Sequence, residues 1–268
     1  MNKVRRVLIA VLLIIVPMIL SACGLSGNED FEYMSQNSVM KISIQSTRDE
    51  SYKFIVTDKD VINDIYKILS TAVVVEEKST LEPDYILKIY KSPTDIKTYS
   101  YVAGLDKKDG GNLYNSTNQY IVSNRLDNDI IRNFANIRKP INFENMYYQS
   151  ILKALDMYES EFKDVKSIGV NIGEDDLVLK FQLSTEIEEF KEELSKSKVA
   201  KLEDVSKDIS DCNVTMKVET TGFTTKKYKA IVTFENKEDN TTKEYYINNK
   251  YNEGQWNINV KEEKPEDF

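Results

Sequence analysis

Near the start of this chain, Cys23 is the residue whose side chain and context both suggest chemistry. The first six residues include three basic ones, residues 7–20 carry no charge, and two small residues precede the cysteine. A positively charged N-terminal region, an apolar stretch and small residues before a cleavage site are typical of a secretory signal peptide. The apolar stretch is short for a transmembrane helix and is interrupted by Pro17. We therefore predict that residues 1–22 are a signal peptide.

The residues Leu20-Ser21-Ala22-Cys23 resemble the lipobox of bacterial lipoproteins. In that family the cysteine thiol receives a diacylglyceryl group, and the peptide bond before it is cut. The resemblance implies a palmitate-type lipid anchor on Cys23, which would hold the protein at the cell membrane on its extracellular side. Two acyl chains anchor a protein far better than one, because each buried methylene contributes about 0.8 kcal/mol. The alternative is an ordinary secretory signal with an incidental cysteine.

The rest of the chain lacks most of the familiar catalytic groups. It has no histidine, which removes the usual general base near neutral pH, the commonest metal ligand and every Ser-His or Cys-His arrangement. The second cysteine, Cys212, alternates with Val214, Met216 and Val218, so we expect a buried, inert thiol; an intermolecular disulfide is the alternative. We predict no catalytic residue, no metal and no cofactor, although paired carboxylates could still support hydrolysis.

The charge of the chain excludes one class of partner. Removal of the three basic residues of the signal takes the formal net charge from −8 to −11. Nucleic-acid binding requires clustered lysine and arginine to neutralise phosphates, so we expect no nucleic-acid partner. The acidic balance also argues against a polybasic attachment to anionic lipid.

The spacing of apolar residues after a polar tether at 23–37 predicts an α+β domain over residues 38–138. Its sheet is expected to be antiparallel. The predicted strands are residues 40–45, 52–56, 72–75, 85–89, 97–102 and 120–122, and the predicted helices are residues 57–69, with Thr57 as its cap, and 126–137. The run at 72–75 consists of alanine and valines, which predicts a buried strand.

This domain resembles the YhfM-like domain of Gram-positive lipoproteins. The resemblance depends on the helix from Val61 to Leu69, the strand entry Pro83-Asp84-Tyr85, the strand with Tyr99 and Tyr101, and the closing helix. It implies an envelope lipoprotein and supplies no established catalytic residues.

Pro140 marks a predicted boundary, with Asn142 as the cap of a helix over 143–158. We expect a second small α+β domain over 143–262, also an antiparallel sheet packed with helices, and an acidic, frayed tail over 263–268. Its predicted elements are a hairpin of residues 168–172 and 177–183, a helix whose capping box pairs Thr185 with Glu188, and strands at 212–218, 228–234, 243–248 and 256–260. This order resembles NTF2-like or cystatin-like domains.

Three groups of side chains are weak candidates for binding sites. Glu174-Asp175-Asp176 lacks the alternate ligand spacing of a calcium loop and is expected to be a solvated hairpin tip. Tyr99, Tyr101 and Tyr114 could stack on carbohydrate, although tyrosine is also an ordinary strand residue. A glutamate-rich helix is expected to be a solvated face; its acidic residues are Glu186, Glu188, Glu189, Glu192 and Glu193. The glycosylation sequons at Asn115, Asn213 and Asn240 are chance matches in a lipoprotein.

The sequence favours a lipid-anchored cell-envelope protein that acts by binding, without catalysis. Its partners would be the membrane, through the diacylglyceryl group, and another envelope protein or a wall component. Two alternatives stay open: an accessory subunit that activates or positions another envelope enzyme, and a carboxylate-based enzyme acting on wall material.

Overall fold

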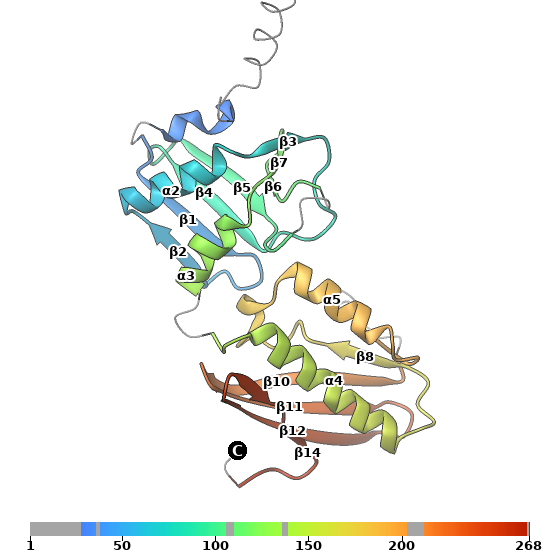
Figure 1. Cartoon of the computed structure of the whole chain (residues 1–268). Helices are drawn as coiled ribbons and strands as arrows, with labels where there is room; N and C mark the ends of the chain where they lie inside the picture. Colours follow the sequence, from blue (N-terminus) through green and yellow to red (C-terminus); the bar gives the residue numbers. More distant parts are fainter. Residues whose placement is uncertain (1–27, 36–37, 106–109, 136–138, 203–211, 267) are drawn as a thin grey trace, which may run out of the picture.

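The computed structural model describes residues 28–35, 38–105, 110–135, 139–202, 212–266 and 268, with two sheets following one another along the chain (Figure 1). We call residues 28–135 the N-terminal half and residues 139–268 the C-terminal half. The predicted signal peptide and Cys23 lie outside the described residues. Among the residues described, no helix combines the length and apolar character needed to cross a membrane.

The N-terminal half contains a seven-stranded sheet in the order β2-β1-β4-β5-β6-β7-β3, and every neighbouring pair of strands is antiparallel. The strands are β1 (Lys41–Ser46), β2 (Lys53–Val56), β3 (Val73–Val75), β4 (Tyr85–Tyr90), β5 (Ile96–Tyr101), β6 (Leu113–Tyr114) and β7 (Gln119–Ile121). The helices are the 3₁₀ helix η1 (Glu29–Met34), α2 (Lys59–Leu69), the π-helix η2 (Leu126–Ile131) and α3 (Arg132–Ala135).

The helices η1, α2 and η2 share one core with the sheet. In α2, apolar residues at helical spacing are buried, from Ile62 to Leu69, against strand residues such as Ile44 and Leu87. The cap lies one residue later than predicted, because the side chain of Asp58, and not that of Thr57, accepts the backbone N–H groups of Asp60 and Val61.

The C-terminal half contains a second sheet in the order β13-β12-β11-β10-β8-β9, with β14 paired to β12. The strands are β8 (Ile168–Asn171), β9 (Ala200–Leu202), β10 (Val214–Thr224), β11 (Lys227–Asn236), β12 (Thr241–Asn252), β13 (Gln255–Asn257) and β14 (Val260–Lys261), and the helices are α4 (Phe143–Glu161), the 3₁₀ helix η3 (Leu179–Phe181) and α5 (Ser184–Leu194). The long strands β10, β11 and β12 form the predicted antiparallel meander, and α4 and α5 pack on this sheet (Figure 1). The chain is therefore an α+β protein with two sheets, as predicted.

The predicted hairpin of residues 168–172 and 177–183 is wrong. Strand β8 pairs in parallel with β9 and β10, while residues 179–181 form a 3₁₀ helix. Val178 and Phe181 are buried and Leu177 is 46% exposed, so the buried side chains repeat every three residues and not every two. Helix α5 starts at Ser184. Its capping interaction differs from the prediction, because the side chain of Glu186, and not that of Glu188, accepts the backbone N–H of Leu183.

Two further expectations about burial are also wrong. The run at 72–75 forms the edge strand β3, where Val73 and Val74 are 59% and 57% exposed, so its valines reflect strand propensity and not burial. Part of the predicted tether forms η1, whose Phe31 is fully buried in the N-terminal core. In the predicted acidic tail, the Phe268 ring packs edge-on against Tyr246.

Candidate functional site

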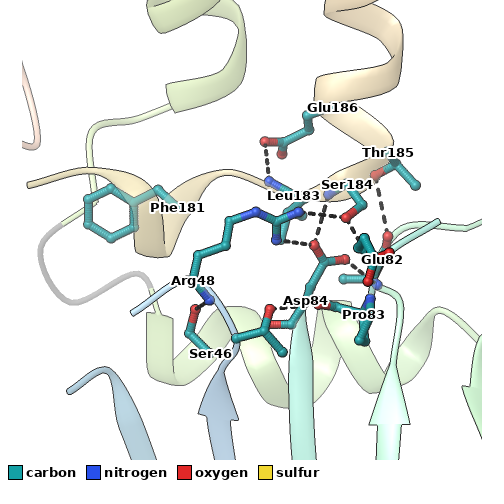
Figure 2. Close-up of polar contacts among 12 residues, drawn as sticks. Ser46, Arg48, Glu82, Pro83, Asp84, Phe181, Leu183, Ser184, Thr185 and Glu186 are labelled. Atoms are coloured by element: carbon teal, nitrogen blue, oxygen red, sulfur yellow. Dashed lines mark hydrogen bonds and ion pairs between the residues drawn. The ribbon is translucent and has the colours of Figure 1, made fainter. Parts of the chain in front are cut away.

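The two halves meet at a buried carboxylate, that of Asp84 just before β4, whose side chain is 1% exposed (Figure 2). Its Oδ1 accepts hydrogen bonds from Arg48 Nη1 at 2.6 Å and from the Ser184 backbone N–H at 2.8 Å. Its Oδ2 accepts the Ala103 backbone N–H at 2.9 Å. Ser184 is the first residue of α5, so a carboxylate of the N-terminal half caps a helix of the C-terminal half. Its negative charge also suits the positive end of the helix dipole.

Further hydrogen bonds surround this carboxylate (Figure 2). Arg48 Nη2 donates to Ser184 Oγ at 2.6 Å, and that hydroxyl donates to the Glu82 carbonyl at 2.8 Å. Thr185 Oγ1 donates to the Ala103 carbonyl at 3.3 Å. Each half also contributes a side chain to the core of the other. Tyr52 of the N-terminal half packs on the C-terminal core, and Leu183 of the C-terminal half packs on the N-terminal core. The start of α5 is therefore fixed to the N-terminal half.

A cavity of about 590 Å³, which we call the junction cavity, lies beside this contact and takes walls from both halves. The N-terminal half contributes Tyr85, Gly104 and Asp127, and the C-terminal half contributes Phe181 and Glu186 among others. The charged side chains of the wall are balanced in number. The acidic residues are Asp127, Glu144 and Glu186, and the basic residues are Arg132, Lys139 and Lys180.

Two carboxyl groups of the junction cavity hold protons more tightly than usual. Burial raises the pKa of Asp127, against the opposing effects of a 2.8 Å hydrogen bond from the Gly104 N–H and of the Tyr101 hydroxyl, which lies beside it without hydrogen-bond geometry. Burial likewise raises the pKa of Glu186 to about 7, and the positive charge of Lys139 partly offsets this rise. A carboxyl group that titrates near neutral pH can exchange a proton with a ligand.

Asp127 lies in an unusual local backbone. It is the second residue of η2, and its carbonyl accepts the N–H of Arg132, five residues later, which is the π-helical pattern. Segments of π-helix are rare and are frequently found at functional sites. Arg132, the residue that follows η2, also lines the junction cavity.

The predicted solvated tip at Glu174-Asp175-Asp176 is wrong for its central residue. Asp175 is 2% exposed, its Oδ1 accepts the Thr220 N–H at 3.0 Å, and its Oδ2 accepts the hydroxyls of Thr220 at 2.7 Å and Tyr147 at 3.1 Å. This carboxylate ties the turn after β8 to β10. No group of three or more potential metal ligands is present within the described ranges.

The structure also locates most of the other residues that the sequence marked as candidates. Tyr99, Tyr101 and Tyr114 are each 8% exposed or less, so they are core residues and do not form a carbohydrate-stacking surface. The glutamate-rich helix is exposed at Glu188 but places Glu186 in the junction cavity. Cys212 is 3% exposed, which confirms a buried thiol, although it precedes β10. Cys23, the predicted lipidation site, lies outside the described residues.

The comparisons with known proteins concern the N-terminal half. Residues 35–140 match the family model described as YhfM protein, which confirms a YhfM-like domain in that part of the chain. The match covers less than half of the sequence and ends before α4. No curated protein and no solved structure matches the chain, so the NTF2-like or cystatin-like resemblance of the C-terminal half stays a prediction.

Proposed function

We propose that this protein is a lipid-anchored protein of the cell envelope that binds a ligand in the junction cavity. The observation that carries the proposal is the cavity itself, about 590 Å³ in volume, with polar and apolar walls from both halves. Cavities of this size between structural units are common ligand sites. The ligand would be a wall component or part of another envelope protein.

The anchor is proposed from the sequence, because the lipobox resemblance ends at Cys23. Cys23→Ala should abolish incorporation of a labelled fatty acid and leave the precursor uncut. Cys212→Ala is the matched control, because it removes the other thiol of the chain and keeps that of Cys23, so its labelling should not change. Unchanged labelling of Cys23→Ala would refute the anchor.

The binding site can be tested by crosslinking in living cells. Thr225 is exposed and lines the junction cavity, whereas Thr242 is exposed on β12 and does not line it. A photo-crosslinking amino acid at position 225 should capture a specific wall component or envelope protein, and the same amino acid at position 242 should not. Capture of one envelope protein would favour the accessory-subunit alternative, whereas equal patterns at both positions would contradict a site in the cavity.

A carboxylate-based enzyme is the second candidate, and one observation favours it. Asp127 and Glu186 line the same cavity, and burial raises the pKa of both carboxyl groups. A carboxyl group with a pKa near 7 is suited to general acid catalysis. Cleavage of purified wall material by the wild-type protein, lost in Glu186→Gln and Asp127→Asn, would establish this function and replace binding without catalysis.

A further inference from the structure

A second cavity, which we call the glutamate groove, lies between α4 and α5 and has a volume of about 380 Å³. The described residues that line it include five glutamates and no lysine or arginine. The glutamates are Glu144, Glu186, Glu189, Glu192 and Glu193. Because Glu144 and Glu186 also line the junction cavity, the two cavities adjoin at these carboxylates.

Most of these carboxylates have no ion-pair partner. Glu193 pairs with Lys196 at 2.6 Å, and the other four form no ion pair with any residue that the structure describes. The cation that lowers the pKa of Glu186, that of Lys139, lies over the ring of Phe143 at 5.3 Å from its centre. Most carboxyl groups of the groove therefore lack an ion-pair partner, and an ammonium group bound beside Glu186 would favour the deprotonated form of that carboxyl group.

The side chain of Tyr148 gives an independent indication of a ligand. Tyr148 lines the groove, is 7% exposed, and its ring stacks on Phe190 at 4.8 Å. Its buried hydroxyl has no hydrogen-bond partner among the described residues. Native structures leave few buried hydroxyls without a partner. The charged groups that act on this hydroxyl are Glu186, Arg48, Asp84 and Glu144, so it lies near the carboxyl groups that both cavities share and also near the Arg48–Asp84 pair.

We propose that the glutamate groove binds a small ligand carrying protonated amino groups, with one amine at Glu144, Glu186 and the Tyr148 hydroxyl. An ammonium group has three N–H donors and no acceptor, so it matches two carboxylates and a hydroxyl oxygen. This inference rests on the proposed binding function and names its ligand class.

The spacing of the glutamates favours a ligand with more than one amine. Glu186, Glu189 and Glu193 are three and four residues apart on α5, so their side chains share one face of the helix. At a rise of about 1.5 Å per residue, the row extends over roughly 10 Å. A chain of methylene groups with an amine at each end can lie along such a row and contact the ring of Phe190 and Leu152, the apolar residues of the wall.

The test is calorimetric titration of the full-length protein in detergent with 1,4-diaminobutane and with 1,5-diaminopentane. The diacetylated diamines, which have the same carbon chains without charge, are the ligand controls. We expect saturable binding of the diamines and none of the diacetylated forms. Glu189→Gln should weaken binding about tenfold, as loss of one charge-assisted hydrogen bond does.

Two further variants separate binding from folding. Glu188→Gln alters an exposed glutamate of the same helix that pairs with Lys191 outside the groove, and it should change affinity less than about twofold. Tyr148→Phe removes a hydroxyl that has no partner in the described structure, so it should weaken binding several-fold without lowering the thermal unfolding midpoint. If Tyr148→Phe folds and binds the diamines with unchanged affinity, the hydroxyl is not part of the binding site.

Three outcomes would overturn the inference. These are no binding of either diamine, equal affinity in Glu188→Gln and Glu189→Gln, or displacement of the diamine by calcium at matched ionic strength, which would make the groove a divalent-cation site. None of them would contradict the proposed function if crosslinking from position 225 still captures a specific ligand. Absence of both binding and crosslinking would contradict both proposals.

Discussion

Replacement of Asp84 by alanine should destabilise the protein more than any exposed charge substitution. The substitution removes the acceptor of Arg48 and of the backbone N–H groups of Ala103 and Ser184. The side chains of Asp84 and Arg48 are 1% and 19% exposed, so the guanidinium would stay in a largely buried position without its partner. Breaking such a pair by removing one member costs about 3–5 kcal/mol.

The matched control is Asp64→Ala, which breaks an ion pair of similar length on the surface. Asp64 and Lys67 are 2.7 Å apart, and their side chains are 55% and 61% exposed. Pairs of this kind contribute about 0.3–0.5 kcal/mol. The two substitutions therefore remove the same chemical group from a buried junction and from a solvated helix face.

The assay is urea unfolding of the full-length protein in detergent, followed by tryptophan fluorescence and by circular dichroism. Trp256 is the single tryptophan and donates to the carbonyl of Ile141, so its fluorescence reports the C-terminal half. Asp84→Ala should lower the free energy of unfolding by about 3–5 kcal/mol and separate the two transitions, because the halves lose their main polar connection. In a double-mutant cycle, Arg48→Ala should cost much less once Asp84 is absent. If Asp84→Ala costs no more than Asp64→Ala, the reasoning about the junction is refuted.

Three further predictions concern single side chains. Burial in the folded state raises the pKa of Glu186 from 4.5 to about 7. The stability that its proton contributes is therefore fully present below pH 4.5 and is lost as the pH rises through about 7. Glu186→Gln should flatten this part of a plot of unfolding free energy against pH. Asp175→Ala should cost about 2–3 kcal/mol in urea unfolding, because it leaves buried donors unpaired, whereas exposed Asp176→Ala should stay within about 0.5 kcal/mol; equal costs would contradict the role of Asp175. Cys212→Ala should cost on the order of 1 kcal/mol and still complement a deletion strain; rapid labelling of the native thiol together with lost complementation would point to a redox role or a disulfide-linked dimer.

The sequence predicted the long, regular elements because their side chains repeat with a clear period. Helix α2 and strand β4 each bury one face, and the period of the buried residues is visible in the sequence. The same rule failed over residues 177–181, where apolar residues occupy both buried and exposed positions. Strands β6 and β9 are two and three residues long, which is too short for a period to show.

The proposed boundary near Pro140 stays a prediction. Each half has its own buried core, so fragments 38–138 and 143–268 are each expected to unfold cooperatively when studied alone. The buried positions of Phe31 and Met34 indicate that a fragment starting at residue 28 should be more stable than one starting at residue 38. Failure of both fragments to unfold cooperatively would mean that the halves share one core.

The candidate site was not predictable in the same way. Asp84 is bonded to residues 19, 36 and 100 positions away in the chain, and no local pattern marks such a residue. The glutamates of α5 were visible as a charged helix, but the sequence could not show that α4 would place Glu144 and the buried Tyr148 hydroxyl beside them. The π-helical turn at Asp127 gave no signal either, because its apolar residues also suit an ordinary helix.

Native mass spectrometry of the full-length protein, extracted in mild detergent from its own membranes, tests the central claim most directly. The claim is that the cavities at the junction of the two halves hold a ligand in the cell. The wild-type protein and Glu188→Gln should carry the same bound small molecule, and Glu186→Gln, which alters one of the two carboxyl groups shared by both cavities, should have lost most of it. Equal occupancy in all three proteins, or a wild-type protein that carries no ligand, would contradict the account.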